Sequence, residues 1–190
     1  MATNSYAVPV GRNVAEYLAI VAWWGVMLAL INAHAVPAHW LTVLVVLGCW
    51  VKTALFGAEN LRQLFAAARQ NLAHHRFLLL MAVNMSQMIL SFMFDFQLLH
   101  RLDPGSFAGV PTDAALAETL FDYFYLSALN FSFFGYSDIL PQTVAARIVN
   151  LTEVLLAFVT VIFMLSDFIS LKESLRDGDG RREHRDGTRN

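Results

Sequence analysis

Long uninterrupted apolar runs restrict the fold of this sequence more than any other feature. A helix of about 20 apolar residues crosses the ~30 Å hydrocarbon layer of a bilayer. Backbone inside that layer must satisfy its own hydrogen bonds, which favours helices. The runs are Val14–Ala33, Trp40–Gly57, Phe77–Leu99 and Val144–Ile169. We therefore expect an all-α integral membrane protein with four transmembrane helices.

The first run has one alternative interpretation. Ala33-His34-Ala35 fits the small-residue cleavage site of a secretory signal peptide. The positive charge before the run is only Arg12, however, and Glu16 offsets it. We therefore expect the first run to be a membrane helix.

Composition excludes several classes of protein. Hydrophobic residues make up 57% of the chain and charged residues 15%, which is far from the balance of a soluble domain. The single cysteine, Cys49, excludes an intrachain disulfide framework. Basic residues of the tail alternate with acidic ones, so no nucleic-acid partner is expected. No nucleophile–base set or metal-ligand cluster is visible, and we do not expect an enzyme.

The histidines do not suggest a haem protein. A membrane haem site needs histidines that face each other inside the helical bundle. Here they lie at the ends of the apolar runs instead: His34, His39, His74, His75 and His100. We expect no cofactor.

The sequence divides into three parts. Residues 1–76 hold the first two spans and Glu59–Arg76, whose helical periodicity predicts an amphipathic helix at the cytoplasmic membrane surface. Residues 77–170 hold the third and fourth spans and the segment between them. Residues 171–190 are charged and lack apolar periodicity, which predicts a disordered cytoplasmic tail.

Polar residues recur along one face of the third span. They are Asn84, Gln87, Ser91 and Asp95, spaced three or four residues apart. A polar stripe on a membrane helix must face protein or water. Lys52, near the end of the second span, is expected to extend its ammonium group to the lipid headgroups.

Lysine and arginine positions predict the orientation. The turn at residues 32–39 has none, and the loop after the third span has only Arg101, whereas residues 52–76 and the tail are rich in both. The positive-inside rule places the basic segments and both termini in the cytoplasm, most simply at the plasma membrane. Residues 101–141 then lie outside.

The segment Phe121–Pro141 lies between the third and fourth spans and reads FDYFYLSALNFSFFGYSDILP. A helix over Ala114–Asn130, capped by Thr112 or Asp113, is expected to precede SFFGYSD. This arrangement resembles the pore helix and T-V-G-Y-G-D filter of tetrameric potassium channels, with Gly135, Tyr136 and Asp138 matching. Downstream, ILPQTVAARIV also resembles that family.

The resemblance implies a re-entrant pore loop and a homotetramer in the lipid bilayer. In such channels, rings of backbone carbonyls from four chains replace the water shell of a permeant ion. The implied filter residues here are Ser132, Phe133, Phe134, Gly135, Tyr136, Ser137 and Asp138. The implied ligands are monovalent cations, K⁺ or Na⁺, held at the filter backbone.

Three filter residues depart from the family pattern. Phe133 stands in place of the threonine whose hydroxyl contributes to the innermost ion site, Phe134 in place of valine, and Ser137 in place of the second glycine. These changes predict a cation channel with altered selectivity. The alternative is a non-conducting relative that keeps the pore scaffold as a structural or sensory assembly.

The last span carries a stripe of polar and small residues that the resemblance implies would line the inner cavity. Its members are Asn150, Glu153, Ala157, Thr160, Met164 and Asp167. Packing against the pore helix is the other interpretation. For Glu153 the sequence leaves both open, because an intramembrane carboxyl group needs either a partner or water.

Overall fold

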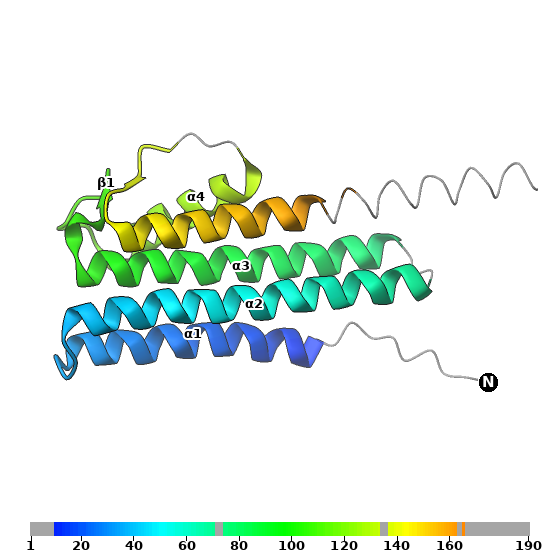
Figure 1. Cartoon of the computed structure of the whole chain (residues 1–190), viewed down its shortest axis with the longest axis horizontal. Helices are drawn as coiled ribbons and strands as arrows, with labels where there is room; N and C mark the ends of the chain where they lie inside the picture. Colours follow the sequence, from blue (N-terminus) through cyan, green and yellow to red (C-terminus); the bar gives the residue numbers. More distant parts are fainter. Residues whose placement is uncertain (1–9, 71–73, 134–136, 163–164, 166–190) are drawn as a thin grey trace, which may run out of the picture.

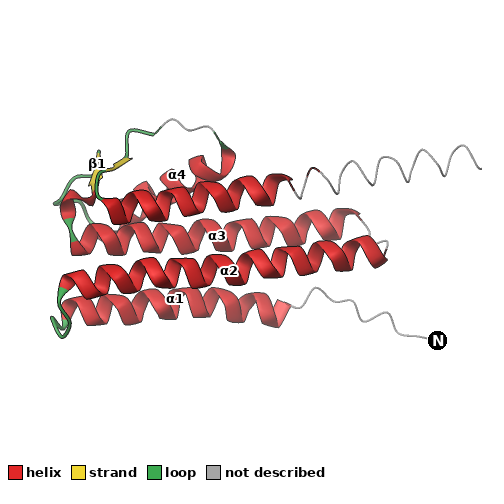
Figure 2. Cartoon of the chain, viewed as in Figure 1, coloured by secondary structure: helices red, strands yellow, loops and turns green. Residues whose placement is uncertain are grey.

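The computed structural model describes residues 10–70, 74–133, 137–162 and 165, and within these residues the fold is almost entirely helical (Figures 1 and 2). A short 3₁₀ helix, η1, and two short strands interrupt the helices. The labelled elements in chain order are α1 (Val10–Asn32), α2 (Ala38–Gln70), α3 (His74–Leu102), η1 (Pro104–Ser106), β1 (Phe107–Ala108), α4 (Leu116–Ser132) and β2 (Leu140–Pro141). A last helix follows β2 and covers Val144–Ile162.

Four long helices lie side by side with alternating direction, and α4 packs against them at one end (Figure 1). The helix α3 contacts α1, α2 and α4. The turn between α1 and α2 lies at the same end of the bundle as β1. The antiparallel arrangement follows from the short connections between successive helices.

Three of the described helical segments are long and apolar enough to cross a membrane: Gly11–Asn32, Ala38–Leu55 and Val144–Ile162. The helix α3 has a comparable length of 29 residues but carries the polar stripe. All four residues of that stripe, Asn84, Gln87, Ser91 and Asp95, are buried. Of the two environments expected for this face of α3, protein or water, the structure shows protein.

The helix α2 differs from the sequence-based expectation. It continues without interruption from Ala38 to Gln70, so residues 59–70 extend the second helix instead of forming a separate one. Residues 74–76 of the predicted amphipathic helix begin α3. Alanine, leucine, glutamine and arginine, which dominate residues 59–70, all favour helix, and no proline or glycine stops α2 there.

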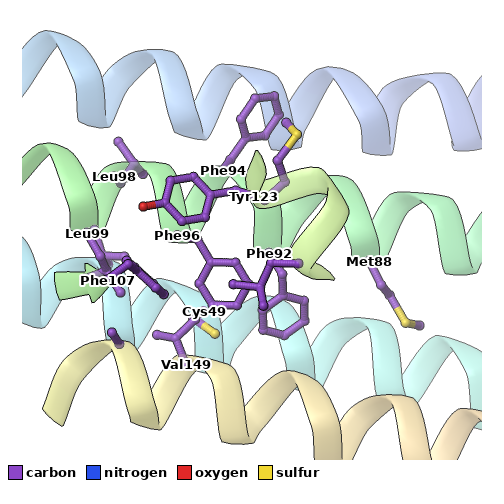
Figure 3. Packing of buried hydrophobic residues seen from close by; sticks show 14 of the residues in the cluster. Cys49, Met88, Phe92, Phe94, Phe96, Leu98, Leu99, Phe107, Tyr123 and Val149 are labelled. Atoms are coloured by element: carbon purple, nitrogen blue, oxygen red, sulfur yellow. The ribbon is translucent and has the colours of Figure 1, made fainter. Parts of the chain in front are cut away.

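The core is built around α3 and includes residues of α1, α2, α4 and the last helix. Phe96 of α3 packs close to Phe107 and Tyr123, with ring centroids 5.4 and 6.1 Å away. Figure 3 shows these rings beside Val149 of the last helix and Cys49 of α2. Aromatic side chains bury large apolar areas, so this cluster fixes the position of α4 against the bundle.

Polar contacts join α1 to α3. Trp24 donates its indole N–H to the side-chain oxygen of Gln97 at 2.9 Å. Further along, the Tyr17 hydroxyl lies 2.5 Å from the Ser86 hydroxyl. Such directional bonds fix the rotation of α1 about its axis, which apolar contacts alone specify poorly.

Candidate ion-conduction site

The helix α4 presents one buried face and one exposed face. Its buried residues, spaced three or four apart as one helix face requires, are Thr119, Tyr123, Leu126, Ser127 and Phe131. On the other side Phe121 is 67% exposed, and Phe124 and Tyr125 are also exposed. An exposed aromatic face on this helix is available to lipid or to another chain.

The start of α4 differs from the prediction. The helix begins at Leu116 with Ala115 as its N-cap, and no side chain caps it. Thr112 and Asp113 therefore do not cap this helix. In the first turn, the hydroxyl of Thr119 donates a hydrogen bond to the backbone oxygen of Ala115 at 3.2 Å.

The helix α4 ends at Phe133 in a left-handed conformation. The φ angle of Phe133 is 56°, and its N–H donates to the backbone oxygen of Asn130 at 3.3 Å. This conformation costs a non-glycine residue roughly 1–2 kcal/mol. The Phe133 ring lies edge-on to Phe158 of the last helix, with centroids 6.3 Å apart. Phe133 thus turns the chain out of α4 and directs its side chain toward the last helix.

Two short strands close the base of the segment that contains α4. Phe107 of β1 pairs with Pro141 of β2, and Ala108 pairs with Leu140. Just beyond this pair, the N–H of Gln142 donates to the backbone oxygen of Ser106 at 2.8 Å. Residues 109–139 therefore leave and return at the same end of the bundle.

Gly109 permits a close approach between the two sides of this base. Its φ angle is +88°, and a Cβ atom at this position would lie 2.2 Å from the backbone oxygen of Asp138. Only glycine, which has no Cβ, avoids that clash and adopts this φ without strain. The backbone that leaves α3 thus packs directly on the backbone that follows the filter-like sequence.

The structure places some of the predicted filter residues and not others. Ser132 is the last residue of α4 and Phe133 its C-cap. The Ser137 hydroxyl accepts a hydrogen bond from the N–H of Ile139 at 3.0 Å, and Asp138 is exposed. Phe134, Gly135 and Tyr136 lie outside the described residues.

Glu153 of the last helix is fully buried against α4. One carboxyl oxygen forms a hydrogen bond with the Ser127 hydroxyl, and the other accepts from the Asn130 side-chain amide at 2.5 Å. The same amide group donates to the side-chain oxygen of Asn150 at 2.9 Å. The Ser127 hydroxyl also lies 3.1 Å from the backbone oxygen of Ile89 in α3. We call Ser127, Asn130, Asn150 and Glu153 the pore-helix polar cluster.

The remaining stripe residues of the last helix behave similarly. Ala157 and Thr160 are buried, and the Thr160 hydroxyl donates to the backbone oxygen of Leu156. Met164 and Asp167 lie outside the described residues. Of the two interpretations of the stripe, packing within the chain is the one that these contacts favour for Glu153, Ala157 and Thr160.

A second buried polar contact joins α2 to α3. The Lys52 ammonium nitrogen lies 2.6 and 2.8 Å from the two carboxylate oxygens of Asp95. The Asp95 side chain is 1% exposed and that of Lys52 is 16% exposed. Lys52 therefore pairs with Asp95 inside the bundle instead of reaching toward headgroups.

Sequence reasoning missed the partners in both polar contacts. Ser127 and Asn130 are three residues apart on α4, a spacing that marks a polar strip on an apolar helix. That strip was a usable signal, because buried polar groups need partners and the last span offers Glu153 and Asn150. For Asp95, the corresponding signal was Lys52, the basic residue within the second apolar run.

A comparison with protein families matches residues 78–173, just over half of the chain, to the family described as ion channel, a pore domain of the two-helix potassium-channel type. No curated protein and no solved structure matches significantly. Domains of this family act in membranes, generally as oligomers, and are not enzymes. The matched region includes α3, α4, the closed base at β1 and β2, and the last helix. With helices that are apolar enough to cross a membrane, the chain is a membrane protein that belongs to the ion channel family.

Proposed function

We propose that this chain forms a homotetrameric channel for monovalent cations. The observation that carries the proposal is the closed segment of residues 109–139, which leaves and returns at one end of the bundle with α4 inside it. Non-helical backbone at membrane depth is stable only where protein or a water-filled path surrounds it. Four copies around one axis would supply such a path.

The direction of α4 suits cations. Its C-terminus at Ser132 leads into the filter-like residues, and the carbonyl end of a helix carries a partial negative charge. Four such ends would point toward the axis. The exposed aromatic face of α4, with Phe121, Phe124 and Tyr125, would then meet neighbouring chains.

Selectivity in this proposal differs from that of potassium channels. Phe133 offers no hydroxyl to an ion, and its ring lies against Phe158, near the inner end of α4. Four such ring pairs would form an apolar constriction, which can gate a pore by excluding water. Four exposed Asp138 carboxylates on the outer side would concentrate cations at the entrance.

The orientation follows from charge. We place α1, α2, α3 and the last helix across the plasma membrane, with α4 re-entering from outside and both termini in the cytoplasm. Arg101 and Arg147 lie near the end of the bundle that carries β1 and β2, whereas most lysines and arginines of the sequence fall within residues 52–76 and 171–190.

Flux through liposomes tests the proposal. Purified protein should pass K⁺ or Na⁺ but not Cl⁻. Phe133→Thr should change the K⁺/Na⁺ ratio, whereas Leu55→Thr, at an exposed apolar residue of α2, is its control. Asp138→Asn should lower cation flux, with Asp113→Asn as the control carboxylate. If neither the parent protein nor Phe133→Thr passes ions, although both form folded tetramers, conduction is refuted.

One observation favours a non-conducting assembly as the second candidate. The Phe133 ring remains 45% exposed while it contacts Phe158, so apolar surface persists where a filter would coordinate its innermost ion. A permanently dewetted axis would follow from this arrangement. Restoration of flux by Phe133→Thr in a silent parent protein would support this candidate.

A further inference from the structure

The Ser127 hydroxyl faces two oxygen atoms but has one proton to give. Its oxygen is within hydrogen-bond distance of the backbone oxygen of Ile89 and of one carboxyl oxygen of Glu153. A backbone carbonyl only accepts hydrogen bonds. If Ser127 donates to Ile89, its bond with Glu153 requires that the carboxyl group be the donor. A carboxyl group donates only when it carries a proton.

The other oxygen of Glu153 receives a proton from a neutral group. The Asn130 amide has two hydrogens, and the two acceptors within its reach are Glu153 and Asn150. The described residues that form hydrogen bonds with Glu153 are Ser127 and Asn130, and neither is basic. These contacts therefore supply every hydrogen-bond partner that a neutral carboxylic acid needs. They supply no positive charge to a carboxylate anion.

Two surrounding features oppose a negative charge on Glu153. The side chain is completely buried, and a buried carboxylate without a counter-ion is costly. Ser127 and Asn130 lie in the last two turns of α4, where the helix dipole is negative.

The other titratable groups do not reverse this balance. From α2, Cys49 and Lys52 face the same region, but both Asp95 oxygens already hold Lys52. Tyr123 of α4 is buried, and its hydroxyl has no partner among the described residues. On the last helix, the partner within the cluster is the uncharged Asn150.

We infer that Glu153 is a protonated positioning residue, which donates to Ser127 while Ser127 donates to Ile89, so that one proton chain joins the last helix, α4 and α3. Loss of the proton would turn Glu153 into an acceptor. Ser127 would then donate either to Glu153 or to Ile89, and α4 would lose one of the two hydrogen bonds made by the Ser127 hydroxyl. Protonation of Glu153 thereby controls how firmly the pore helix is held.

Any effect of Glu153 protonation on conduction rests on the proposed channel function, but the inference that Glu153 is protonated does not. Infrared difference spectroscopy of the assembled full-length protein reports a buried carboxylic acid directly by its carbonyl band. At neutral pH the parent protein should show one such band that Glu153→Gln removes. Glu118→Gln, which changes an exposed carboxyl group on α4, should leave it unchanged.

A second variant covers the case in which Glu153→Gln fails to fold. Ser127→Ala removes the acceptor of the Glu153 proton and should shift the same band to the position of a less hydrogen-bonded acid. Absence of the band at neutral pH in folded parent protein overturns the inference, and so does a band that Ser127→Ala does not shift. If the band is present but no ion flux is measured, only the channel proposal is refuted, because the infrared signal does not depend on conduction.

Discussion

Lys52→Met should strongly destabilise the helical bundle, because it leaves a buried carboxylate without its partner. Both oxygens of Asp95 contact the Lys52 nitrogen, at 2.6 and 2.8 Å, and the Asp95 side chain is 1% exposed. Removing one member of a buried ion pair typically costs about 3–5 kcal/mol. We expect a loss in that range for Lys52→Met.

Asp95→Asn should cost less, because the two partners differ in their access to water. The Lys52 side chain is 16% exposed and has a flexible four-carbon stem, so its unpaired ammonium group can move toward the membrane surface. Asp95 has a short side chain and is fully buried in α3, so its carboxyl group cannot move in the same way. The expected order of destabilisation is therefore Lys52→Met above Asp95→Asn.

The double variant Lys52→Met/Asp95→Leu separates pair loss from packing loss. Replacing both members of a buried pair with apolar groups is often neutral or stabilising. The double variant should therefore be more stable than Lys52→Met alone. Reversible unfolding in mixed detergent micelles, followed by circular dichroism, measures the free energy of unfolding of each variant.

The exposed pair of Arg12 and Glu16, at 3.4 Å on α1, supplies the control. Exposed ion pairs contribute about 0–1 kcal/mol, so Glu16→Gln should change stability by no more than that. If Lys52→Met costs as little as Glu16→Gln, or if the double variant is no more stable than Lys52→Met alone, the reasoning is refuted.

The remaining predictions concern α4 and its closure. Gly109→Ala should lower the free energy of unfolding by more than about 2 kcal/mol, because it combines backbone strain with the clash at Asp138. The control Gly25→Ala has open space around it and should not destabilise the protein. Equal unfolding free energies of the two variants would contradict this prediction. Phe133→Gly relieves the left-handed strain and should be more stable than Phe121→Gly by about 1–2 kcal/mol in the same unfolding assay.

Much of this protein could be predicted from its apolar runs and the spacing of its polar residues. Among the described residues, helices occupy nearly all of each predicted span, and the polar stripe on α3 is buried. The filter-like sequence placed a pore segment between α3 and the last helix, and the family match covers this region. Periodicity determines such features because it sets which face of a helix is polar, whatever that helix packs against.

Pairing between helices was decided only by the tertiary structure. The sequence contained Lys52, Asp95, Ser127 and Glu153, but their contacts depend on the depth and rotation of each helix, which side-chain packing sets. The sequence also did not determine the helix boundaries. The helix α2 continues through the predicted break near residue 59, and α4 begins without its predicted cap. The approach of Gly109 to Asp138 depends on the path of two distant backbone segments. Local sequence determined the elements, and the packing of those elements determined which buried polar groups became partners.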